Sequence, residues 1–194
     1  ISPTAFGKTD NFIARGSDYG SPANYWHGVD IQVNARLRGG VTVQGGTSTG
    51  RVVNDTCDLA IDNPSQYDCH KVYPFQTDIR GMAIYTVPKI DVQLSGTMQS
   101  RPGPEILAQW NVPANVIAQS LGRPPSGAVA NIQTNILTAG ELYGDRITQV
   151  DMRIAKLLRF GRTRTNIGID FYNLFNSNVP LTYVNVYGTT WGNP

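Results

Sequence analysis

The sequence predicts an all-β protein in which long hairpins follow one another as an antiparallel meander. The composition favours strands and turns over helices, since the 194 residues include 20 glycines and 12 prolines and only 15% are charged. Apolar and polar residues alternate over three long stretches, with the two-residue period of a strand that has two different faces. Short turns join the arms within each stretch, whereas long connections separate the stretches.

The first hairpin is expected at residues 26–50. Over residues 29–37 the side chains alternate without exception. One face carries Val29, Ile31, Val33, Ala35 and Leu37, and the other carries Asp30, Gln32, Asn34 and Arg36. The run Arg38-Gly39-Gly40 supplies turn residues, after which the alternation resumes toward Gly50.

Two further hairpins are expected at residues 77–100 and 147–175. In the first of these, Pro88 marks the turn because proline cannot donate a hydrogen bond to a strand ladder. Its returning arm places one set of side chains on a common face, namely Val92, Leu94, Gly96 and Met98. The final arm of the last hairpin does the same with Ile167, Ile169 and Phe171, after a short basic turn at residues 159–163.

The connections at about residues 51–76 and 101–144 are long. Within the second, residues 113–121 are expected to form a short helix, with Pro113 near its first turn and Gly122 after its last. Long two-faced strands with short turns at one end and long loops at the other are typical of an outer-membrane β-barrel. A soluble sandwich is the alternative, although its strands are usually nearer five or six residues. No run approaches the roughly 18 apolar residues of a membrane helix, so membrane insertion would require strands.

Cys57 and Cys69 lie 12 residues apart in a polar stretch that has the composition of a loop. We expect a disulfide between them, which implies an oxidising compartment. A metal site is the rival interpretation, because Asp58 follows Cys57 and His70 follows Cys69. No CxxC or HxxxH spacing supports a tetrahedral site, so the disulfide is favoured.

Several segments resemble a known family. They are residues 6–12, 25–30, 33–37, 45–51, 57–69, 99–104, 158–165 and 170–176. In this order and spacing they resemble the C-terminal β-barrel region of TonB-dependent outer-membrane receptors, above all the large receptors that carry a carboxypeptidase-regulatory-like domain. The resemblance covers nearly the whole chain, and the last segment, which begins at Asp170, resembles the penultimate strand of that family.

The resemblance implies an energy-coupled uptake receptor whose barrel has about 22 strands around a plug. The chain departs from that pattern, because neither a plug, a TonB-box-like segment nor the final strand is recognisable in it. We therefore expect residues 1–194 to form a single barrel-derived domain that is a fragment of such a receptor. The expected location is the outer membrane of a Gram-negative-type bacterium, or the extracellular space after release.

With about six strands the chain cannot close even an eight-stranded barrel, so its sheet edges must find partners. We expect a non-enzymatic, structural role in which copies assemble through open sheet edges and loops into a ring, tube or filament. The alternatives are a section of an intact receptor for nutrient uptake, in contact with membrane lipid and the rest of the receptor, and a soluble β-sandwich binding module.

No catalytic, cofactor or metal site is expected, and the formal charge of +2 gives no reason to expect a nucleic-acid partner. The residues expected to act are those of an apolar contact face on three of the strands. They are Val29, Ile31, Val33, Val92, Leu94, Ile167, Ile169 and Phe171.

Overall fold

The computed structural model describes residues 13, 15–59, 69–125, 127 and 129–194. The chain divides into two compact units. The smaller comprises residues up to 25 together with residues 53–71, and it contains a short 3-10 helix, η1 (Gly16–Asp18). The larger comprises residues 26–52 and 72–194 and contains most of the long sheet.

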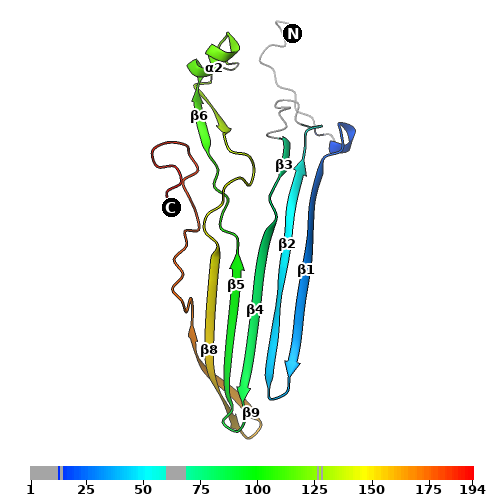
Figure 1. Cartoon of the computed structure of the whole chain (residues 1–194), viewed down its shortest axis with the longest axis vertical. Coiled ribbons are helices and arrows are strands. Elements are labelled where there is room, and N and C mark those ends of the chain that lie inside the picture. The colour runs from blue at the N-terminus through cyan, green and yellow to red at the C-terminus, as the bar shows by residue number, and fades with distance from the viewer. Residues whose placement is uncertain (1–12, 14, 60–68, 126, 128) are drawn as a thin grey trace. The chain divides into compact units, whose positions relative to one another are not determined.

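Six long strands form the sheet in the order in which they occur along the chain (Figure 1). They are β1 (Ala23–Leu37), β2 (Val41–Asp55), β4 (Gln76–Val87), β5 (Val92–Arg101), β8 (Ile147–Phe160) and β9 (Thr163–Phe171). The strand pairs from β2 to β9 are antiparallel, and the short strand β3 (His70–Val72) also pairs with β2. The predicted all-β antiparallel meander is therefore confirmed.

Three tight turns join the hairpins at the positions that the sequence predicts. Gly39 and Gly40 have φ angles of +91° and +88°, values that a residue with a Cβ rarely adopts. The second turn has positive φ at Lys89 and Asp91, and the third has it at Gly161. Because each hairpin pairs antiparallel with the next, all three turns lie at one end of the sheet, which we call the turn end.

The connection between β5 and β8 contains more structure than the alternation pattern predicts. The expected helix is present as α2 (Ala114–Leu121), with Pro113 as its N-cap and Gly122, at φ +68°, as its C-cap. It lies between two five-residue strands, β6 (Gln109–Pro113) and β7 (Asn131–Asn135), which form a separate antiparallel pair. The other predicted loop is also partly ordered into strands, since β2 continues to Asp55 and β3 follows it.

The C-terminal segment folds back onto this connection. The backbone N–H of Gln109 donates to the carbonyl of Asn185 at 2.8 Å, and the N–H of Tyr187 donates to the carbonyl of Gln109 at 2.9 Å. The indole Nε1 of Trp191 donates to the carbonyl of Leu107 at 2.8 Å. Two of the few buried apolar residues of the larger unit, Ile106 and Ala108, lie here. The six long strands contribute only Val53 and Ala155 to the buried apolar residues of the described structure.

Candidate functional site

The strand register gathers apolar side chains on one face of the long sheet, because residues paired across a ladder point to the same side. One row runs across four strands through Tyr85, Leu94, Ile154 and Ile169. Neighbouring rows add further apolar residues. This apolar face comprises Val41, Val43, Ile79, Ala83, Tyr85, Val87, Val92, Leu94, Met98, Val150, Met152, Ile154, Ile167, Ile169 and Phe171, with Val29, Ile31 and Val33 following by alternation along β1.

All eight residues that the sequence predicts for a contact face lie on this apolar face. Val29, Ile31 and Val33 on β1 and Ile167 and Ile169 on β9 remain between 56% and 66% exposed. Burying one such side chain is worth about 1.5–3 kcal/mol, so leaving a whole row of them in water is unfavourable. The described residues supply no second layer over this face, so it is an extended exposed apolar surface.

Hydroxyl groups border the apolar face at the end remote from the turns. Thr49 Oγ1 and Thr77 Oγ1 are 2.9 Å apart, and Ser100 Oγ and Thr148 Oγ1 are 2.8 Å apart. The register places both pairs on the same side of the sheet as the apolar residues. Polar side chains thus end the apolar face on four neighbouring strands, with the Thr49–Thr77 pair two residues farther from the turn end along β4 than the Ser100–Thr148 pair, whose row contains Ile79.

Lys156 borders the apolar face at the turn end. It pairs with Val92 and Ile167 and therefore lies in an apolar row, but its Nζ reaches out to the carbonyl oxygen of Ile90. On β5 the residues from the Lys156 row to the Ser100 row number nine, from Val92 to Ser100. That distance corresponds to ~26 Å of strand. A strand that spans a bilayer needs roughly 9–11 residues.

Arg146 stabilises the border formed by the hydroxyl groups of Thr49, Thr77, Ser100 and Thr148. Its Nε donates to Ser100 Oγ at 2.7 Å, and its Nη2 donates to the carbonyl of Ser100 at 3.0 Å and to the carbonyl of Thr77. Ser100 is itself buried. One guanidinium thus connects the ends of β4 and β5 through a planar set of donors that a lysine cannot reproduce.

We expect Arg146→Ala to lower the free energy of unfolding by ~1–3 kcal/mol, because it leaves Ser100 Oγ and the carbonyl oxygens of Ser100 and Thr77 without this donor in a partly buried region. Arg146→Lys should recover only part of that loss. Urea unfolding in detergent micelles measures both variants. The control is Arg80→Ala, since Arg80 is exposed and its side chain forms no hydrogen bond or ion pair within the described residues. Equal destabilisation by the Arg80 and Arg146 changes would contradict the assignment.

The opposite, polar face of the sheet carries charged and amide side chains. Arg153 Nη1 lies 2.9 Å from the carboxylate of Asp170 on the neighbouring strand, and Gln99 donates to Gln149 at 3.3 Å. Near β1 this face is hollowed by an open concavity of about 550 Å³. Its lining includes Asp30, Gln32, Asn34, Gln44, Asp78 and Arg80. The sheet therefore presents one apolar face and one mainly polar face, whose apolar exceptions include Met82, Ile84 and Leu157.

The smaller unit contains the predicted disulfide. Cys57 and Cys69 are bonded, with their Cα atoms 4.7 Å apart, so the rival metal site built on their thiolates is not formed. His70 Nδ1 instead lies 2.8 Å from Asp55 Oδ2, and this contact, together with the backbone N–H of Cys57, holds the pKa of Asp55 below its ordinary value. In the described part of the chain, no group of three or more His, Cys, Asp or Glu residues is placed to hold a metal ion.

Thiol labelling checks the disulfide in solution. After unfolding without reductant, the chain should react with no thiol reagent, because its only two cysteines are bonded to each other. After reduction, two thiols should react. Two labelled thiols before reduction would show that the bond does not form in the protein as purified.

Comparison with protein-family models, with curated proteins and with solved structures gives no match for this chain. Over the residues that the structure describes, no helix combines the length and the apolar character needed to cross a membrane.

Proposed function

We propose that this chain is a non-enzymatic structural element, a wall segment of an outer-membrane-type β-barrel that completes its sheet by pairing edge to edge with copies of itself. The observation that supports the proposal most strongly is the exposed apolar face on a sheet with two open edges. The apolar face contacts lipid or a neighbouring copy, and the polar face contacts water. The resemblance to the C-terminal barrel region of TonB-dependent receptors agrees with this role.

The two edges of the sheet are β1 and β9, each of which pairs on one side only. Every residue of β9 is exposed, so its outer row of N–H and C=O groups is available for pairing. In lipid, each of those groups would cost several kcal/mol if it stayed unpaired. A further antiparallel strand alongside β9 satisfies this outer row, which holds about half of the backbone groups of the nine residues, at a net ~1 kcal/mol per hydrogen bond.

The direction of the edge strands allows identical copies to join. β1 runs toward the turn end and β9 runs away from it, because the main path contains an even number of alternating strands. A second copy in the same orientation therefore places its β1 antiparallel to β9, which continues the meander without a change of pattern. This contact is head-to-tail, so it gives a closed ring or tube if its rotation closes and a filament if it does not.

An intact TonB-dependent receptor for nutrient uptake is the second candidate, in which the remaining strands of one long chain cover both edges. The nine residues of β5 from the Lys156 row to the Ser100 row, both bordering rows included, favour it, since this length suits a bilayer. A soluble sandwich is less well supported, because the described residues provide no second sheet over the apolar face.

Mass spectrometry of the intact protein from its source distinguishes the two candidates. A species near 21.2 kDa, the mass of this chain, supports the self-assembling fragment. A species several times larger supports the receptor. Fractionation of the same cells tests the proposed location, which is the outer membrane or, after release, the medium.

A further inference from the structure

The three tight turns of the long sheet concentrate positive charge. Residues 36–42, 86–92 and 156–164 contain seven basic residues against one acidic residue, Asp91, a net charge of +6. The rest of the chain has nine basic and thirteen acidic residues, a net charge of −4. The basic residues of the turn end are Arg36, Arg38, Lys89, Lys156, Arg159, Arg162 and Arg164.

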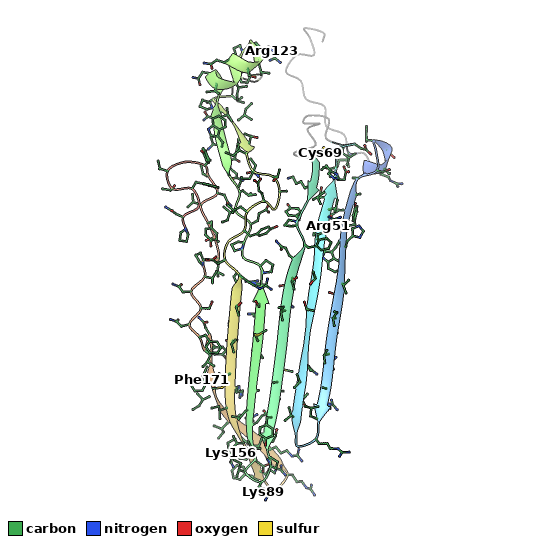
Figure 2. The ribbon with its side chains drawn as sticks, viewed as in Figure 1. Arg51, Cys69, Lys89, Arg123, Lys156 and Phe171 are labelled. Carbon is green, nitrogen blue, oxygen red and sulfur yellow. A yellow bond between two sulfur atoms is a disulfide. The ribbon has the colours of Figure 1, made fainter. Side chains whose placement is uncertain are left out.

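These charges come together in space as well as in sequence. The pairing of Val41 with Tyr85 and of Val92 with Lys156 puts the three turns at the same end of the sheet. Figure 2 shows Lys89 and Lys156 at that end. The β8–β9 hairpin lies against the second turn, because the N–H of Leu157 donates to the carbonyl of Asp91 at 2.9 Å, and Arg159, Arg162 and Arg164 follow on β8, in the third turn and on β9.

Most of this charge is not neutralised within the chain. Asp91 pairs with Arg159 at 2.9 Å, and Lys156 bonds to a backbone carbonyl. The other five cations are exposed, and none of them forms a side-chain hydrogen bond or an ion pair in the described structure. Their positions are Arg36, Arg38, Lys89, Arg162 and Arg164.

Large apolar side chains are exposed among these cations. Phe160 is 65% exposed, Leu37 57% and Ile90 52%, and each belongs to one of the three turns or its flanks. Phe160 lies at the end of the apolar face, beyond Lys156. This combination of side chains is typical of the part of a membrane protein that lies at the lipid-water interface. There the aromatic rings enter the headgroup region, and the cations bind phosphate.

We propose that the turn end binds the anionic phosphates of phospholipid headgroups. The site is the set of five unpaired cations, and Phe160, Leu37 and Ile90 enter the boundary between headgroups and acyl chains. Nucleic acid offers similar phosphates, but it would leave these three side chains exposed to water, so a membrane is the better fit. The inference rests on the proposed function in one respect, namely that the apolar face meets lipid.

Vesicle flotation of the purified 194-residue chain tests the proposal. The chain is mixed with neutral phosphatidylcholine vesicles or with vesicles that also contain phosphatidylglycerol, at low and at high salt. We expect the wild-type chain to prefer anionic vesicles at low salt, with a preference that high salt removes. The triple change Arg38→Gln, Lys89→Gln and Arg162→Gln should reduce that preference roughly a hundredfold, about fivefold per cation.

The control removes the same charge elsewhere, through Arg15→Gln, Arg80→Gln and Arg101→Gln, and it should keep the preference. Three results would overturn the proposal: equal binding of the wild-type chain to both vesicles, equal loss in the two triple variants, or binding to a DNA duplex as tight as to the anionic vesicles. Neither triple variant changes the backbone N–H and C=O groups through which β1 and β9 pair. Sedimentation of the same samples therefore reports separately whether copies assemble. A failed lipid preference with intact assembly therefore refutes this inference alone.

Discussion

Ile31→Asp should block membrane insertion or assembly of the chain, whereas Gln32→Asp should leave both intact. Ile31 is 56% exposed on the apolar face, and Gln32 is its neighbour on the polar face, where it lines the concavity. A carboxylate on a lipid-facing or copy-facing surface loses its water, at a cost on the order of 2 kcal/mol for each copy. On the polar face the same carboxylate stays hydrated.

Flotation with vesicles and sedimentation without them measure the two outcomes on the same preparations. The comparison is closely matched, because both changes add one negative charge to adjacent residues of one strand. Equal damage from the two variants would contradict a two-faced sheet and would indicate that any charge in β1 prevents folding.

Cysteines placed on the two edge strands should form disulfides between copies. Gln32→Cys on β1 is combined with Asn166→Cys or Arg164→Cys on β9, and Asn34→Cys is combined with each in the same way. Within one chain these strands are separated by four others in the sheet, far beyond the ~7 Å that a disulfide tolerates between Cα atoms. Any bond between them is therefore intermolecular, and non-reducing electrophoresis should show a ladder of multimers.

Several pairs are needed because the register between β1 of one copy and β9 of the next is set by the contact between copies, not by the register within one chain. The native cysteines do not interfere, since they are bonded to each other. The control pair, Gln44→Cys on β2 and Gln93→Cys on β5, occupies strands that already have neighbours on both sides. A ladder from the control pair of the same intensity, or no ladder from any edge pair, would argue against edge-to-edge pairing.

The long strands were predictable from sequence because their signal is local. Residues 29–37 alternate strictly. The turn between β4 and β5 contains Pro88, and the turn between β8 and β9 contains Gly161. The helix α2 was predictable for a similar reason, since Pro113 and Gly122 mark its two ends. In each case the residues that determine the element lie within it or directly at its ends.

The features that the sequence did not indicate depend on register or on distant partners. β6 and β7 have only five residues each, and their partners are separated by a helix, so neither shows a long alternation. Arg146 binds groups of residues 77 and 100, and no local pattern identifies them. Lys156 is recognised as the limit of the apolar face only after the β5–β8 register puts it beside Val92.

Sedimentation velocity of the purified 194-residue chain without detergent, at micromolar concentration, decides whether the open edges pair. The open outer edges of β1 and β9 and the uncovered apolar face predict that the chain does not persist as a monomer. The expected result is a distribution of multimers, whose shape by electron microscopy is a ring, tube or filament. A stable, well-folded species of 21.2 kDa would contradict the proposal, because it would show that the chain satisfies its own edges and covers its own apolar face.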